Sequence, residues 1–351
     1  INPGDLKGVP SHLREAYESH VEATCRMTGE LFLQDGDILQ AWRYLKTIGE
    51  RDQIRAALER LEPAQATDEI LGLAIREGIH PVRGFELLLE SSGLCSGITT
   101  YDHDLYAPLS EQKKIAGMLV KRLYRDLVLS VRCDIQERKK PAPEETDLVD
   151  IIRSRPWVFE NNNSHADPTH IAAVLRIGLI AEAQDELLMA VSIAEYAKKV
   201  PAVFQNGAPD LFDGGASDYA KYYRALLGQD AEKTAEFFCT RLAGYKNAEV
   251  GNGPAEHVLL LLWRLGKKSE ALGIWENSIS DVPPDLEGHV IPSFYDLCQQ
   301  AGDNERLSRV AMKHHDIAAW AAAKIMASGG KPKAAPLLKE KPASAPSDDL
   351  S

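Results

Sequence analysis

The residues best suited to chemistry lie in one short segment, 157–170, just before an apolar stretch. It contains His165, Asp167 and His170 within six residues, and imidazole and carboxylate groups at such spacing bind divalent metals or exchange protons. A second polar cluster, at 101–104, could meet the first one in space and adds His103. The sequence thus offers these four residues as candidate ligands of a divalent metal. One hypothesis is an all-α metal-binding protein or metal-dependent hydrolase.

A structural interpretation of the same residues is favoured. Asp167 is a typical N-cap, Pro168 suits the first position of a helix, and the preceding asparagines suit a turn. His103 is expected in an ordinary loop that follows a glycine-rich turn at 92–100. On this interpretation the protein carries no cofactor, and an enzymatic role is not favoured.

Other chemical motifs lack the partners they need. The His-His-Asp sequence at 314–316 superficially resembles the metal-binding pair of HD-domain phosphohydrolases, but too little helical chain follows to supply the last ligand of that family. We expect it to cap the next helix. The carboxylates of 205–218 lack calcium-loop spacing, so Ser217 or Asp218 is expected to cap a helix at 219–227.

The elements that must position these residues are helices. Apolar residues three and four apart, with few alternating β-branched runs, predict an all-α chain. Breaks at glycine and proline are short, which predicts antiparallel helix pairs. The expected helical segments are 11–62, 68–92, 111–133, 168–200, 217–243, 254–279, 291–312 and 315–327.

Turn glycines recur at a regular interval: Gly228, Gly266 and Gly302 lie 38 and 36 residues apart. The residues around one turn are Leu259, Leu262, Gly266, Ala271, Trp275 and Pro283, and those around another are Gly29, Phe32, Gly36, Ala41, Leu45 and Ile48. Both patterns resemble the tetratricopeptide repeat (TPR), a helix-turn-helix of roughly 34 residues. A left-handed glycine suits the turn, and small residues let the two helices approach closely.

The resemblance is partial, because Leu307 and Lys233 stand where two other units would have the alanine, and 96–165 hardly matches. It implies antiparallel helix pairs stacked as an irregular, TPR-like, right-handed superhelix. The alternative is an irregular helical bundle whose glycines only end helices.

Composition suggests four parts along the chain. N-terminal helical repeats are expected over 1–133, a charged, proline-containing linker or exposed loop over 134–150, and C-terminal helical repeats over 151–328. The tail, 329–351, is rich in lysine, proline and small residues, so we expect it to be disordered.

The charge balance excludes a general polyanion binder. The chain has 52 acidic and 40 basic residues and a net charge of −12, so no nucleic-acid partner is expected. No apolar run is long enough to span a bilayer, so no membrane partner is expected either. Five scattered cysteines indicate free thiols in a reducing compartment, and we expect a cytoplasmic protein.

The TPR resemblance implies a concave face that holds an extended peptide. Cationic and aromatic residues on two helices are candidates for that contact: Lys121, Arg125, Tyr219, Tyr222 and Arg224. The favoured function is therefore a non-enzymatic adaptor or scaffold whose partner is a protein or peptide, and acidic peptides suit these cations.

Overall fold

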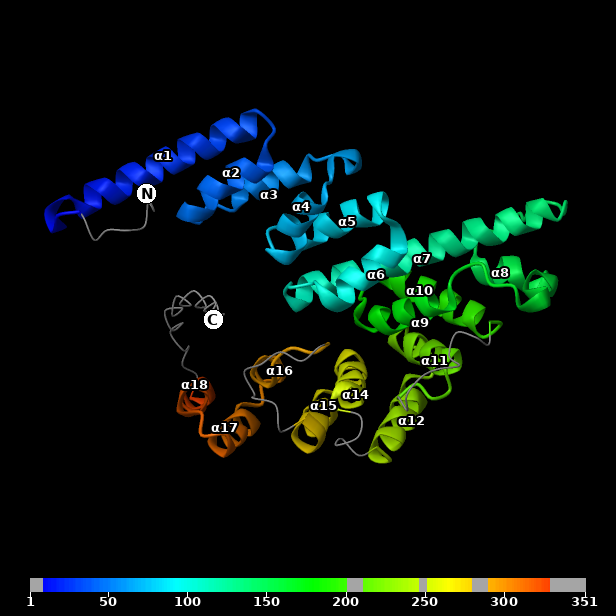
Figure 1. Cartoon of the computed structure of the whole chain (residues 1–351). Helices are drawn as coiled ribbons and strands as arrows, with labels where there is room; N and C mark the ends of the chain where they lie inside the picture. Colours follow the sequence, from blue (N-terminus) through cyan, green and yellow to red (C-terminus); the bar gives the residue numbers. More distant parts are fainter. Residues whose placement is uncertain (1–8, 201–210, 246–250, 280–289, 329–351) are drawn as a thin grey trace, which may run out of the picture.

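The chain folds into helices joined by short turns (Figure 1). The computed structural model describes residues 9–200, 211–245, 251–279 and 290–328, so the tail predicted at 329–351 lies outside the described residues. No strand occurs among the described residues, and the all-α prediction is confirmed. The α-helices are α1 (Arg14–Gln34), α2 (Ile38–Leu45), α3 (Asp52–Glu59), α4 (Asp68–Leu71), α5 (Pro81–Ser91), α6 (Gly93–His103), α7 (Leu109–Glu137), α8 (Leu148–Arg153), α9 (Pro168–Ile177), α10 (Gln184–Ala197), α11 (Ala216–Leu226), α12 (Ala231–Ala243), α14 (Gly253–Arg264), α15 (Lys268–Ile274), α16 (Phe294–Ala301), α17 (Asn304–Lys313) and α18 (Ile317–Ala327).

Shorter helical turns supplement these α-helices. Turns of 3₁₀-helix occupy Ser11–Leu13, Lys46–Ile48, Pro63–Gln65, Pro156–Asn162 and Gly178–Ile180, and π-helices occupy Gly72–Arg76 and Trp275–Ile279. The chain runs from α1 at the upper left of Figure 1 to α7 at the right. It then returns through α9–α12 to α18 at the lower left. Consecutive helices pack on each other, most extensively α1 with α2, α10 with α11, α14 with α15, and α17 with α18.

One type of turn joins several of these pairs. A glycine with φ between 71° and 83° ends the first helix, and the next residue donates its N–H to the carbonyl five residues earlier at 2.8–2.9 Å. This is the Schellman arrangement, which satisfies the last carbonyls of a helix. The prediction of left-handed turn glycines is confirmed at Gly36, Gly228, Gly266 and Gly302.

Other glycines serve close contact between helices. A Cβ on Gly29 would lie 2.6 Å from Leu45 Cγ, so α1 and α2 approach closely, as the repeat pattern predicts. A Cβ on Gly97 would lie 2.6 Å from Leu89 Cδ2. The prediction of a glycine-rich turn at 92–100 is wrong, because Gly97 lies inside helix α6 and allows α6 to pack on α5.

The boundaries of the predicted linker at 134–150 also need correction. Helix α7 continues to Glu137 and α8 begins at Leu148, so only the residues between them are non-helical. The Arg132 guanidinium donates to the carbonyl of Pro143 at 3.3 Å and to that of Glu145, which ties this segment to α7. Helix α7 also packs on α9 and α10, and one hydrophobic core crosses the predicted boundary.

The turn geometry leads to a prediction about two glycines in the same helix pair. Gly266→Ala should lower the free energy of unfolding by about 1–2 kcal/mol, because its left-handed φ of 79° strains any residue with a Cβ. Gly273→Ala, inside α15 with open space around it, should raise it by about 0.5–1 kcal/mol. Urea denaturation measures both, and equal midpoints for the two variants would contradict the assigned turn.

Candidate functional site

Two adjoining cavities form what we call the groove. The larger, of about 580 Å³, lies between the first turns of α7, the start of α10 with the two residues before it, and α16. The smaller, of about 460 Å³, is lined by residues of α10, α11 and α14. Glu182 lines both cavities, so the groove draws on helices from several pairs.

Ion pairs fix the wall that α7 and α10 share. The Lys113 ammonium lies 2.6 Å from a Glu182 carboxylate oxygen. Glu186 lies over Gly117, where a Cβ would collide with its carboxylate, and accepts from Lys121 Nζ at 3.0 Å. These contacts neutralise both glutamates and leave their side chains with little freedom in the groove.

Two cations of the groove keep donors available. Arg264 reaches from α14 into the smaller cavity and donates one N–H to the Leu179 carbonyl at 3.2 Å. Burial lowers the pKa of Arg264, and no carboxylate of the described residues forms an ion pair with it. Lys114 is exposed in the larger cavity and has no ion pair within the described part of the chain. Arg264 and Lys114 can therefore bind anionic groups of a ligand.

None of the five residues predicted to bind a partner is among those that line the groove. Lys121 pairs with Asp185 and Glu186, and Arg224 donates to Glu195 at 2.8 Å, so both cations have intramolecular partners. Arg125 is exposed and forms no ion pair with any described residue. Its surface is a different part of α7 from the groove.

The prediction of Tyr219 and Tyr222 as accessible binding residues is corrected by their burial. Their residue exposures are 4% and 0%. Tyr219 stacks on Phe212 at 4.1 Å between ring centroids, and the Tyr222 hydroxyl donates to the His257 carbonyl at 2.9 Å. Burial raises the pKa of Tyr222. The helical spacing of these tyrosines indicated a core-facing stripe, which their polar chemistry obscured.

The metal hypothesis fails first at His165. Its side chain is 3% exposed, and both ring nitrogens have partners: Nδ1 lies 2.9 Å from the Tyr196 hydroxyl and Nε2 lies 3.2 Å from Asp134 Oδ2. Burial opposes ionisation of Asp134, but hydrogen bonds from Arg138 and His165 outweigh it, so the pKa of Asp134 is lowered. His165 is therefore part of a structural network.

The other candidate ligands do not form a metal-binding group of three or more with His165 in the described part of the chain. Asp167 caps α9 by accepting the Thr169 N–H at 2.8 Å, as predicted, and His103 lies exposed at the end of α6. His170 belongs to the first turn of α9. Within the described ranges, no group of three or more His, Cys, Asp or Glu residues could hold a metal ion. Asp316 caps α18, as expected for the 314–316 motif.

Asp218 has a role that the sequence did not reveal. We expected a helix cap, but α11 begins at Ala216, and the Asp218 side chain is 1% exposed inside it. Its carboxylate accepts from Lys221 at 3.0 Å, from the Gly214 N–H at 2.7 Å, and from Arg241. No local spacing indicates this contact, because Arg241 lies on α12. Burial raises the pKa of Asp218, but these three donors outweigh it and the net pKa is lowered.

The buried Asp218–Arg241 pair should control how the free energy of unfolding depends on acid pH. Because the pKa of Asp218 is lower in the folded state than its ordinary value of 3.8, its stabilisation is full above that value and is lost as the pH falls through the folded-state pKa. Asp218→Asn should lower the free energy of unfolding at neutral pH by about 2–4 kcal/mol and flatten its acid dependence. The control is Asp213→Asn, at an exposed carboxylate, with an expected cost below about 1 kcal/mol. Urea titrations from pH 7 to pH 3 measure both, and an unchanged acid dependence in Asp218→Asn would count against this assignment.

Comparisons with known proteins give no relative. No protein-family model, curated protein or solved structure matches the chain. Among the described helices, none combines the length and the apolar character needed to cross a membrane. The function must therefore be inferred from the groove and from the chain's own residues.

Proposed function

We propose that the protein is a non-enzymatic interaction module that binds an extended peptide segment of a partner protein in the groove. The main support is that two cavities meet at Glu182 and draw their walls from α7, α10, α11, α14 and α16. Open grooves between successive helix pairs are the binding surfaces of helical-repeat proteins. The recurring Schellman turns support the TPR-like arrangement that the sequence resembles.

The charges of the groove favour an acidic peptide. Lys113 pairs with Glu182, and Lys121, outside the groove, pairs with both Glu186 and Asp185. Of the remaining ionic groups, Lys114 and Arg264 are cations without ion pairs among the described residues, whereas Asp296 is a single carboxylate that already accepts from Ser293 at 2.6 Å. These two unpaired cations suit carboxylates of a ligand.

The apolar groups of the groove give the peptide a second type of contact. Leu187, Leu226 and Leu227 line the smaller cavity beside Arg264. In an acidic peptide with an apolar residue next to a carboxylate, the apolar side chain would fill this cavity while the carboxylate binds the Arg264 guanidinium. A cytoplasmic location is part of this proposal, and it is supported by all five cysteines being unpaired.

A peptide-binding experiment tests the groove. Peptides selected from a random linear library on the full chain should be enriched in acidic residues, and Arg264→Gln should weaken their binding about tenfold or more by removing a charged contact. Lys114→Ala should also weaken it, while Arg264→Lys should keep part of the affinity. Fluorescence anisotropy measures each dissociation constant.

The matched control is Arg125→Ala, which removes an exposed cation of α7 outside the groove. It should leave binding unchanged. Unselective peptide sequences, or equal losses of affinity in Arg125→Ala and Arg264→Gln, would reject the groove as the binding site. Melting temperatures of all variants separate a loss of contact from a loss of folding.

A further inference from the structure

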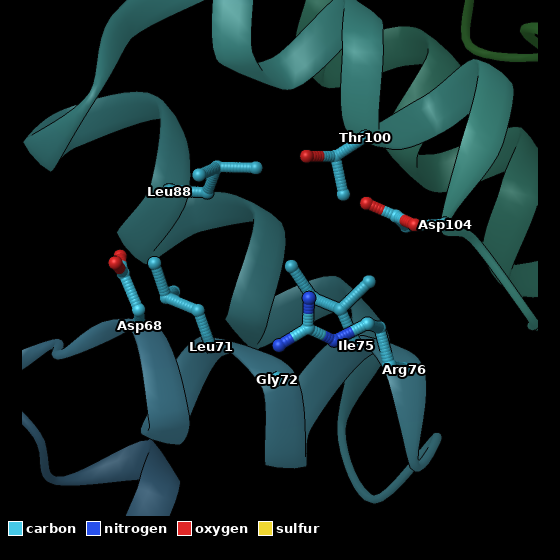
Figure 2. Close-up of a pocket in the computed structure, with 8 residues that line it drawn as sticks. All are labelled: Asp68, Leu71, Gly72, Ile75, Arg76, Leu88, Thr100 and Asp104. Atoms are coloured by element: carbon cyan, nitrogen blue, oxygen red, sulfur yellow. The ribbon is translucent and has the colours of Figure 1, made fainter.

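A third cavity, distinct from the groove, lies among α4, the π-helix Gly72–Arg76, α5 and α6 (Figure 2). Its volume is about 360 Å³, within the range of small-molecule sites. Leu71, Ile75 and Leu88 give it apolar walls and are at most 7% exposed. The charged residues at its edge are Asp68, Arg76 and Asp104.

The sequence places one wall on a single helical face. Asp68, Leu71, Gly72, Ile75 and Arg76 are three and four residues apart and line the same cavity. The backbone widens there into a π-turn, in which the Glu77 N–H donates to the Gly72 carbonyl at 3.1 Å. π-turns are rare in proteins, and many of those that occur lie at functional sites.

Gly72 sets the position of the Arg76 side chain. In Figure 2 the guanidinium extends across Gly72 into the cavity, and a Cβ at Gly72 would lie 2.5 Å from Arg76 Nη2. The Arg76 side chain has no ion pair and no hydrogen bond with any described residue. The exposed guanidinium, a planar cation suited to carboxylates, therefore lies unpaired beside the apolar walls.

Two carboxylates face the cavity from opposite sides. Figure 2 shows Asp68 on the side of α4 and Asp104 on the side of α6, near Thr100. Neither carboxylate has an ion pair or a side-chain hydrogen bond with a described residue. These two anions are therefore available to cationic groups of a ligand.

Neighbouring residues of the same elements behave differently. Asp102, two residues before Asp104, accepts from Arg176 at 2.7 and 2.9 Å, and Glu77, next to Arg76, accepts from Lys46 at 2.7 Å. Asp102 and Glu77 are thus paired within the protein, whereas Asp68, Arg76 and Asp104 at the cavity are not. These three charged side chains are therefore available to a ligand.

We propose that this cavity binds a free basic α-amino acid, because two anions and one cation are the charge complement of that class. The ligand carboxylate binds Arg76, its α-ammonium group binds Asp104 and the Thr100 hydroxyl, and its side-chain cation binds Asp68. The aliphatic stem contacts the apolar walls. The site does not depend on the peptide groove, so either proposal can fail alone.

Isothermal titration of the full chain tests the ligand class. L-lysine, L-ornithine and L-arginine are the probes, norleucine is the control without the side-chain cation, and cadaverine is the control without the carboxylate. At least one basic amino acid should bind, and its affinity should exceed that of both controls about tenfold or more. Absence of binding by all three probes, or equal binding of either control, overturns the proposal.

Variants test the assignment of each group. Arg76→Gln should remove the preference for lysine over cadaverine, and Asp68→Asn should remove the preference for lysine over norleucine. Gly72→Ala should weaken lysine binding without lowering the melting temperature, because Gly72 has a helical backbone and the clash falls on the mobile end of Arg76.

Two controls complete the test. Arg55→Gln and Arg125→Gln each remove an exposed helical arginine that does not line the cavity. Both should bind lysine as the parent chain does. Unchanged lysine binding in Arg76→Gln and Asp68→Asn, or equal losses in the two controls, overturns the site.

Discussion

Close contact between helices at residues without a Cβ is the constraint on which the rest of this structure depends. At Gly178 a Cβ would lie 2.8 Å from both Val120 Cγ2 and the Tyr223 hydroxyl, so α7 and α11 meet there with no room to spare. Tyr223 then donates to the Leu175 carbonyl at 2.6 Å inside the core. This contact joins α7 and α11 through the turn Gly178–Ile180, and the first turns of the same α7 line the groove.

The same packing determines which charges remain available. Lys121 and Arg224 are on helices that bring a carboxylate within reach, so their charges are used inside the protein. Arg264 is held by a backbone carbonyl alone, and Arg76 lies across a glycine without any acidic partner among the described residues. Cations that line a cavity without an intramolecular counter-charge are therefore the better candidates for ligand contact.

Local rules were enough to predict the turns and caps but not the contacts between distant helices. Gly266 and Asp167 behave as expected, because a left-handed turn and an N-cap depend on a few adjacent residues. Tyr222 was predicted to contact a partner because of its aromatic, polar side chain, although its helical spacing from Tyr219 indicated a position in the core. The contacts of Asp218 with Arg241, and the placement of Asp104 opposite Asp68, arise from tertiary packing and leave no local signal.

The net charge of −12 does not decide which ligands the two sites prefer. Exposed charges are screened beyond about 8–10 Å at physiological salt, so each site responds mainly to the groups that line it. The groove offers two cations without ion pairs among the described residues, Lys114 and Arg264, whereas the cavity of Figure 2 has one more anion than cations. An acidic chain can therefore hold an acidic peptide at one site and a basic small molecule at another.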